Sequence, residues 1–428
     1  MARLAIIGTG YVGLTTGACF AHLGHEVVCA DVDAEKVARL QAGEVPIVED
    51  RLDKLVREGL EDGRLSFVVG GADAVAECEF AFLCVPTPEA ADGSADLSYI
   101  QAASAEIGPV LAAESIVINK STVPVGSTRV VERALGRADV TVVSNPEFLR
   151  EGSAVQDFLH PDRIVIGCED RSAAVRVLSL YLGVTAPTLV TDPASAETIK
   201  YAANAFLATK LSFVNAIAAV CEGVGADVED VMLGLGYDTR IGAQFLHPGP
   251  GWGGSCFPKD TRALVRIAAD SGYDFQLLDG VIAVNEEQFT RVADKVRTAV
   301  GGDLMGRSVA VWGLTFKAGT DDLRDSPSLA VVQRLLAEGA SVRAYDPTVD
   351  SADLLPDELR DVEVGTDPVD ACRGAEALVV LTEWDEFRWQ DPATVGEVMA
   401  NAALVDARNL LDRSRWESRG FVHRGIGR

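Results

Sequence analysis

The glycine pattern near the N-terminus constrains the fold of this chain more than any other feature. A short apolar segment (2–8) leads directly into Gly8-Thr9-Gly10-Tyr11-Val12-Gly13, and a segment of helical composition (14–23) follows. A second apolar segment (27–30) then ends at Asp31. Glycines at these spacings permit a tight turn and let the backbone approach a pyrophosphate at the N-terminus of a helix. The pattern therefore predicts a βαβ unit that binds a dinucleotide.

The acidic residue at the end of the second strand indicates which dinucleotide is bound. A carboxylate there accepts hydrogen bonds from the ribose hydroxyl groups of NAD and repels the 2′-phosphate of NADP. Asp31 occupies this position, and Lys36 in the next helical segment is placed to help hold the adenosine end. We therefore predict NAD as the cofactor.

Strand and helix patterns alternate on both sides of a long helical centre. Apolar strand patterns recur at 65–69, 80–85, 115–119 and 141–143, and again at 308–313, 342–345, 377–382 and 403–406. Between these groups, an alanine-rich helical segment runs from Pro193 to about Gly223 and is apolar on most faces, as in a helix buried between domains or subunits. We predict an α/β protein in which two doubly wound Rossmann-like domains (1–192 and 301–428) are joined by a central helical dimerisation domain (193–300).

Composition excludes several classes of partner. The net charge of −26, from 38 basic and 64 acidic residues, argues against nucleic acid and anionic membranes. Charges interrupt the apolar runs before the roughly 18–20 residues that a membrane span needs, and residues 1–8 lack signal-peptide features, so we expect a cytoplasmic protein. The eight cysteines form no CxxC pair and the five histidines are dispersed, so no metal site is expected.

A second glycine-rich stretch carries the candidate nucleophile. It runs Gly249-Pro250-Gly251-Trp252-Gly253-Gly254-Ser255-Cys256-Phe257-Pro258-Lys259-Asp260. Its glycines let the backbone approach a ligand closely, and the charged residues beside the thiol influence how much nucleophilic thiolate exists. Taken alone, the stretch also fits a turn beside a buried structural cysteine. The motifs elsewhere in the chain favour the nucleophile.

Two loops that follow predicted strands hold candidate ligand contacts. Thr87 and Thr122 come just after strands, where side chains of an open α/β sheet face the ligand, although loop capping is the alternative explanation. Glu147 and Glu151 are four residues apart and would share one face if residues 144–152 were helical. A solvated charged turn fits that segment equally well.

The apolar central helix contains two polar side chains one turn apart, Lys200 and Asn204. A buried lysine is costly unless it is paired or used in chemistry. This pair is therefore a candidate for binding negative charge on a substrate.

With these segments in order, the chain resembles the nucleotide-sugar dehydrogenases over essentially its whole length. The resemblance is carried by GTGYVGL (8–14), KSTVPVGST (120–128), NPEFLREG (145–152), ETIKYAANAFLATK (197–210), GPGWGGSCFPKD (249–260) and GLTFKAGTDDLRDSPS (313–328). The form GGSCFPKD is more similar to the enzymes for UDP-glucose than to the UDP-N-acetylmannosamine branch, whose loop usually has GGHC.

The resemblance implies a four-electron oxidation. In this family the C6 alcohol of UDP-glucose becomes a carboxylate through two hydride transfers, with two NAD+ and one water consumed per sugar. Cys256 would add to the aldehyde to give a thiohemiacetal, and the second hydride transfer would give a thioester that water hydrolyses. A nucleophilic thiol is needed because hydride cannot leave an aldehyde until a nucleophile adds to it.

The same resemblance implies roles for the remaining candidates. Lys200 and Asn204 would stabilise the C6 oxyanion. Asp260, with Thr122 and a water, would handle protons. Glu151 would be the base for the hydrolytic water, with Glu147 supporting it.

It also implies binding contacts and a homodimer. The implied NAD contacts are Gly8, Gly10, Tyr11, Val12, Gly13, Asp31, Lys36, Thr87, Thr122, Glu151, Lys259 and Arg324. The implied contacts to the sugar nucleotide are Phe148, Leu149, Arg150, Glu151, Lys200, Asn204, Phe245, Leu246, Gly249, Gly251, Trp252, Gly253 and Lys317. Arg240 would reach the substrate of the other subunit.

Three other functions fit parts of the pattern. The nearest is the same chemistry on GDP-mannose or another nucleotide sugar, since sequence patterns fix a base-binding pocket poorly. A one-step dehydrogenase of the β-hydroxyacid type shares the N-terminal architecture and the helical centre, but it needs neither the cysteine loop nor residues 301–428. A sensor that only binds nucleotide sugars is disfavoured by the presence of Cys256, Lys200 and Asp260.

Overall fold

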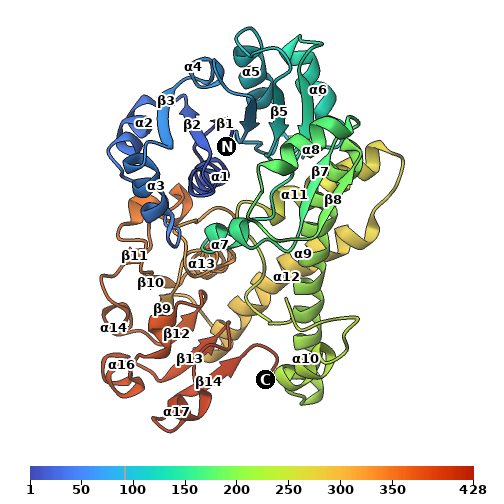
Figure 1. Cartoon of the computed structure of the whole chain (residues 1–428). Coiled ribbons are helices and arrows are strands. Elements are labelled where there is room, and N and C mark those ends of the chain that lie inside the picture. The colour runs from blue at the N-terminus through green and yellow to red at the C-terminus, as the bar shows by residue number, and fades with distance from the viewer. Residues whose placement is uncertain (91–92) are drawn as a thin grey trace. The chain divides into compact units, whose positions relative to one another are not determined.

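The computed structural model describes residues 1–90 and 93–428 and divides the chain into two compact units. The first comprises residues 1–203 and 262–272, and the second comprises residues 204–261 and 273–428. The predicted domain boundaries at residues 192 and 300 stay predictions. Figure 1 traces the elements from blue at the N-terminus to red at the C-terminus.

The first unit contains an eight-stranded sheet of order β3-β2-β1-β4-β5-β6-β7-β8. The described strands pair in parallel except β6 with β7. The strands are β1 (Arg3–Ile7), β2 (Glu26–Asp31), β3 (Leu65–Val69), β4 (Phe80–Leu83), β5 (Ile116–Asn119), β6 (Thr141–Ser144), β7 (Ile164–Gly167) and β8 (Thr188–Thr191). The strand order reverses between β1 and β4, and a doubly wound sheet binds its ligand at such a switch point.

Helices cover both faces of this sheet. Leu4 and Ile6 of β1 belong to one hydrophobic core, whereas Ala5 and Ile7 belong to another, because successive side chains of a strand point to opposite faces. The helices on the face of Leu4 are α1 (Tyr11–His22), α2 (Ala34–Gln41), α3 (Leu52–Glu61), α7 (Ala154–Leu159) and α8 (Arg171–Ser179). Those on the face of Ala5 are α4 (Gly71–Val75), α5 (Ser98–Ile107) and α6 (Ser127–Leu135).

The second unit contains a six-stranded parallel sheet of order β11-β10-β9-β12-β13-β14. Its strands are β9 (Ser308–Trp312), β10 (Ser341–Tyr345), β11 (Glu363–Val364), β12 (Ala377–Val380), β13 (Ala403–Asp406) and β14 (Val422–Gly425). Its helices are α10 (Val228–Gly236), α12 (Gln276–Ala299), α13 (Pro327–Ala337), α14 (Pro368–Ala371), α15 (Asp385–Arg388), α16 (Pro392–Val398) and α17 (Arg413–Glu417), with 3-10 turns η1 (Ala352–Leu354) and η2 (Asp357–Leu359). Two doubly wound sheets and a helical centre confirm the predicted fold class.

Helix α9 (Pro193–Val224) runs from the first unit into the second. Asp192 caps it, since its Oδ1 accepts a hydrogen bond of 2.8 Å from the N–H of Ser195. By length and composition alone α9 could cross a membrane, with a mean hydropathy of 1.4 over 18 residues. Core helices of soluble proteins pass the same test, and Val214 and Ala218 of α9 belong to the hydrophobic core of the second unit.

The second sheet repeats the first turn of the N-terminal sheet. Gly8 N donates to Ala30 O and Gly313 N donates to Tyr345 O, each at 2.8 Å. In the second unit Asp346 ends β10 in the place that Asp31 holds in the first. Its Oδ2 accepts hydrogen bonds from the N–H groups of Leu314 and Thr315, the Thr315 hydroxyl and Trp384 Nε1. Its Oδ1 accepts two more from Thr348, and the residue is 2% exposed.

The structure excludes the helical alternative for residues 144–152. Residues 145–150 are not helical, so Glu147 and Glu151 do not share a helix face. Pro146 disfavours helix at the residue before it, and the Asn145 side chain is bonded to Lys120, Tyr181 and the Val165 carbonyl. The sequence pattern predicts a helix over 261–271, but α11 (Phe257–Asp270) begins four residues before Thr261, because a proline in the first helical turn loses no helical hydrogen bond.

Candidate active site

The dinucleotide loop has a geometry that glycine alone permits. Gly8 has φ of 97°, and a Cβ atom there would lie 2.6 Å from the Cys84 carbonyl oxygen. A Cβ atom on Gly13 would lie 1.9 Å from the Gly8 oxygen. Gly10 precedes α1 and offers no capping side chain, so the first N–H groups of α1 are placed to bind a pyrophosphate. These features fit a dinucleotide.

Asp31 ends β2 as an ionised acceptor. Its Oδ2 accepts hydrogen bonds from Thr9 N (3.0 Å), Thr9 Oγ1 (2.5 Å) and Lys36 Nζ (3.0 Å). Burial alone would raise the pKa of Asp31, but the hydrogen bonds from Thr9 and Lys36 outweigh burial and lower the pKa to about 2. Lys36 thus lies against Asp31, next to the expected ribose position.

Thr87 and Thr122 lie together beyond the ends of the neighbouring strands β4 and β5. The Thr87 hydroxyl donates to the Thr122 carbonyl at 2.9 Å, and both residues are buried. The loops that follow β4 and β5 are thereby joined by a hydrogen bond.

Glu147 and Lys200 form a buried ion pair. Their side chains are each 5% exposed, and Lys200 Nζ lies 2.7 Å from Glu147 Oε1. Burial would raise the pKa of Glu147, but the Lys200 ammonium outweighs it and lowers the pKa. The ammonium also lies 5.6 Å from the centre of the Phe148 ring. The pair fixes a buried positive charge on α9.

The segment after Glu147 is held by its own contacts. Arg150 makes two side-chain hydrogen bonds to Asp157, at 3.0 and 2.6 Å, and the exposed Arg150 therefore has a fixed direction. Glu151 follows in a turn that a bond from Ser153 N to Arg150 O closes at 2.9 Å. Leu149 donates its N–H to Glu147 Oε2 at 2.5 Å.

In the second unit, the glycine-rich loop packs tightly against its support. A Cβ atom on Gly253 would lie 1.9 Å from the Asp325 oxygen, and Gly254 has φ of 83° and donates its N–H to the same oxygen at 3.3 Å. Trp252 exchanges two backbone hydrogen bonds with the Asn285 side chain, and its Nε1 donates to Ser212 Oγ at 2.9 Å. The loop is therefore rigid where it meets the cysteine.

Cys256 differs from the other seven cysteines. All eight lie within the described residues and none of them is in a disulfide, but Cys256 alone is partly exposed and the others are buried. It immediately precedes α11, and the N-terminus of a helix stabilises negative charge. This position suits a thiolate nucleophile.

Asp260 lies one turn beyond Cys256 and is 1% exposed. Its Oδ2 accepts a hydrogen bond of 2.6 Å from Asn204 Nδ2, and its Oδ1 accepts one of 2.6 Å from Lys259 Nζ. Asn204 lies one turn after Lys200 on α9. The second unit thus places a carboxylate, an amide and a thiol on adjoining elements.

The remaining candidates lie around the loop or on the surface of the second unit. Gly249 accepts and donates hydrogen bonds with Gln288 and Asn215, and a Cβ atom on Gly251 would lie 2.4 Å from the Phe289 ring. The others are Phe245, with a positive φ of 61°; Leu246, buried in the core; Lys317, over the Phe316 ring; Arg324, paired with Asp322; and Arg240, exposed and paired with Asp238.

Sequence reasoning missed the residues that hold these groups in place. They are Glu49, Lys120, Asn145, Glu197, Asn215, Asn285, Gln288 and Asp325. Glu197, for example, is buried and accepts hydrogen bonds from Gly126 N and from Thr128 N and Oγ1 at the start of α6. The available signal was a polar residue within an apolar helical pattern, as at Glu197 and Asn285.

Comparison with known proteins covers almost the whole chain. Three models of the UDP-glucose/GDP-mannose dehydrogenase family match: the NAD binding domain at 2–185, the central domain at 194–287 and the UDP binding domain at 310–413. The chain is 47% identical to a UDP-glucose 6-dehydrogenase of Rhizobium meliloti, over 100% of this chain and 99% of that protein. It is 45% identical to one from Pseudomonas aeruginosa, over 100% and 97%.

A solved structure agrees. A UDP-glucose dehydrogenase from the archaeon Pyrobaculum islandicum superposes with a TM-score of 0.90 at 38% identity, over 100% of this chain and 98% of that chain. The geometry of the Gly8–Gly13 turn and of Asp31 is consistent with the NAD binding domain model, which matches this part of the chain. This chain belongs to the UDP-glucose/GDP-mannose dehydrogenase family and is an NAD-dependent dehydrogenase.

Proposed function

We propose that this protein oxidises UDP-glucose to UDP-glucuronate, with two NAD+ and one water per sugar, through a thiohemiacetal and a thioester on Cys256. The observation that carries the proposal is the position of Cys256. It is a partly exposed thiol at the start of α11, one turn from the buried Asp260. The names of the relatives with 45–47% identity support UDP-glucose over GDP-mannose.

Donors on α9 are suited to a developing oxyanion. Lys200 has three N–H bonds, of which Glu147 accepts one, and the Asn204 amide has two, of which Asp260 accepts one. We propose that these two groups donate to the C6 oxygen, whose negative charge grows when a proton leaves the alcohol or when the thiol adds to the aldehyde. Asp260 and Thr122, through a water, would take up the proton.

NAD is proposed to bind in the first unit through the Gly8–Gly13 turn, the N–H groups of α1, Asp31, Thr87 and Thr122, whereas contacts from Lys259 and Arg324 stay predictions. When bound, NAD+ accepts the hydride in both oxidations. The final step is hydrolysis of the thioester, in which Glu151 would activate the water. Glu147 keeps Lys200 in place during the reaction and remains ionised because of it.

The proposal is tested by the NADH formed per sugar nucleotide consumed, with UDP-glucose and GDP-mannose compared. We expect two NADH per UDP-glucose and a carboxylate product. One NADH per UDP-glucose would contradict the thioester route. Faster turnover of GDP-mannose would replace the proposed substrate but leave the chemistry in place.

Removing the charge of Asp31 is expected to weaken NAD binding. A hydrogen bond to a charged group contributes about 1.5–3 kcal/mol, so Asp31→Asn should raise the KM for NAD+ by roughly ten- to a hundredfold. The pKa of Asp31 is lowered to about 2, so its carboxylate is ionised throughout the ordinary carboxyl range. Its contribution to NAD binding is therefore complete above that range and is lost only as the pH falls towards 2. Initial rates with NAD+ and NADP+ check this. Asp62→Asn, on the surface, is the control.

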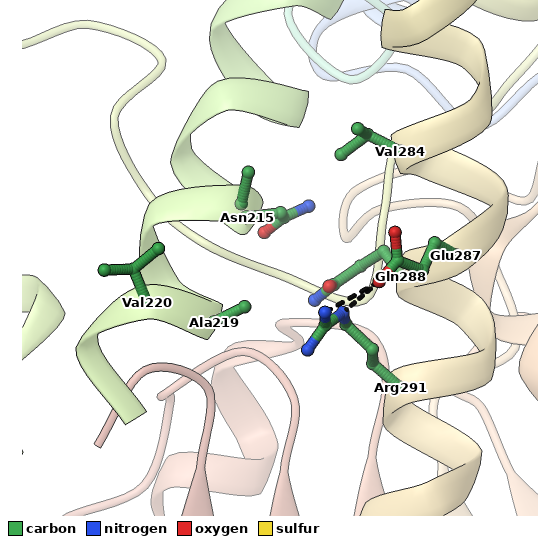
Figure 2. Close-up of a pocket in the computed structure, with 8 residues that line it drawn as sticks. Asn215, Ala219, Val220, Val284, Glu287, Gln288 and Arg291 are labelled. Carbon is green, nitrogen blue, oxygen red and sulfur yellow. Dashed lines mark hydrogen bonds and ion pairs between the residues drawn. The ribbon is translucent and has the colours of Figure 1, made fainter. Parts of the chain in front are cut away.

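We propose that the protein is a homodimer that associates through α9. Phe206, Phe213 and Val220 are 66%, 52% and 57% exposed and recur every seven residues, so they form one apolar stripe. Beside it is a cavity of about 240 Å³ between α9 and α12. Figure 2 shows Asn215, Ala219 and Val220 on one side of this cavity and Val284, Glu287, Gln288 and Arg291 on the other.

Phe213→Glu is expected to shift the protein from dimer to monomer, because the stripe would carry a charge at its centre. Light scattering after size-exclusion chromatography measures the mass. Leu182→Glu, which also replaces an exposed apolar residue but lies in the first unit, is expected to leave the mass unchanged. A monomeric wild-type protein would contradict the proposal.

We further propose that the protein works in the cytoplasm.

A further inference from the structure

Glu49 lies in the loop between α2 and α3 and carries a buried carboxylate that the proposed chemistry does not use. The residue is 8% exposed. Its Oε1 accepts a hydrogen bond of 2.8 Å from Ala154 N, and its Oε2 accepts one of 2.7 Å from Gly152 N. Oε2 also bonds the Tyr11 hydroxyl, which lies 2.9 Å from the Arg150 carbonyl oxygen. We call the Tyr11 hydroxyl, the Glu49 carboxylate and the backbone of residues 150–154 the clasp.

The clasp joins two segments that have separate tasks. Tyr11 is the first residue of α1 and belongs to the Gly8–Gly13 turn. Residues 150–154 contain the turn with Glu151. The side chain of Ser153, the residue before α7, accepts no hydrogen bond from the N–H groups of that helix. Glu49 supplies from a distance the acceptor for the first of these groups, the N–H of Ala154.

The bonds of the clasp are strong enough to define its geometry. Burying a carboxylate is costly unless hydrogen bonds compensate it, and here three donors do so. Burial, and next the hydrogen bond to Glu49, raise the pKa of Tyr11 above its ordinary value, so the phenol keeps its proton. Glu49 is 38 residues from Tyr11 and 103 from Gly152 in sequence, so no local turn could make this connection.

We propose that Glu49 is a positioning residue that links dinucleotide binding to the turn carrying Glu151. A pyrophosphate bound at the start of α1 would order Tyr11, and the clasp would then hold residues 150–154 more firmly. Glu151 would be in place for hydrolysis only when the cofactor is bound. The catalytic half of this inference rests on the proposed function, whereas the link itself does not.

Hydrogen exchange of the full-length protein, with and without NAD+ and without sugar, tests the link. In the wild type NAD+ is expected to slow exchange of the amides of residues 150–154 at least about fivefold. In Glu49→Gln this slowing should be absent, while NAD+ still protects residues 8–14, and in Tyr11→Phe the slowing should be absent as well. Glu44→Gln, which changes an exposed glutamate of the same loop, should behave as the wild type. Wild-type slowing at 150–154 in both variants would overturn the proposal.

Turnover tests the catalytic consequence. A displacement of reacting groups by about 1 Å can lower a rate by roughly a hundredfold, so Glu49→Gln should lower kcat by about ten- to a hundredfold, with the KM for NAD+ within about threefold. Intact mass spectrometry should show the covalent thioester accumulating, which a general loss of folding would not produce. An unchanged kcat would overturn the assigned role. Absence of turnover in the wild type would contradict the proposed function instead, because the exchange experiment uses NAD+ alone.

Discussion

Cys256→Ser is expected to lower steady-state NADH formation from UDP-glucose by at least about a thousandfold, as loss of a covalent nucleophile does in other enzymes. At neutral pH a serine hydroxyl is almost fully protonated, and it forms a poor leaving group for hydrolysis compared with a thiolate. The variant differs in one atom, so the loop around Gly253 and Trp252 should keep its contacts. In a single turnover the variant should release at most one NADH per site and no carboxylate.

The control for this variant is Cys168→Ser, which changes a buried thiol in the first unit. It should give two NADH per sugar even if its melting temperature falls. Two NADH per sugar from Cys256→Ser, at a rate within tenfold of the wild type, would return Cys256 to a structural role.

Lys200→Met is expected to have the second largest effect, on both stability and rate. It leaves the Glu147 carboxylate buried without its partner, and breaking a buried pair in this way costs about 3–5 kcal/mol of unfolding free energy. It also removes the proposed oxyanion donor, which is expected to lower kcat by about a hundred- to a thousandfold. Denaturant unfolding and initial rates measure the two effects.

The double variant Lys200→Met, Glu147→Gln separates them. Neutralising Glu147 should recover much of the lost stability, whereas the rate should stay low. Recovery of the rate as well would show that Lys200 acts only through folding. In the wild type the pKa of Glu147 is lowered by its partner Lys200. The contribution of this ion pair to the free energy of unfolding is therefore complete above the ordinary carboxyl range, and it is lost as the pH falls through the lowered pKa.

The sequence was sufficient for features that depend on neighbouring residues. The Gly8–Gly13 turn and the acid at Asp31 are adjacent along one βαβ unit, so their pattern predicted both fold and cofactor. Strand β8 was missed because three of its four residues are exposed, and it therefore lacks the buried pattern of a strand. Strand β11 was missed because it has only two residues.

The supporting contacts were beyond sequence reasoning because their partners are distant along the chain. Asn145 is fixed by Lys120 and Tyr181, and these bonds make the segment after it irregular. Nothing near Glu49 in the sequence distinguishes it from a surface glutamate. Only the folded chain shows that its carboxylate faces Gly152.

The repeated turn of the two sheets has a consequence for stoichiometry. Asp31 and Asp346 occupy the same position in the two units, but Asp346 accepts six hydrogen bonds from the protein, four at one oxygen and two at the other, whereas Asp31 accepts four. A ribose diol approaching Asp346 would have to displace donors of the protein itself, whereas Asp31 lies at a partly exposed edge. The two sheets share this turn but are not expected to bind the same ligand. We expect each chain to bind one NAD molecule, and its second sheet to bind a different nucleotide.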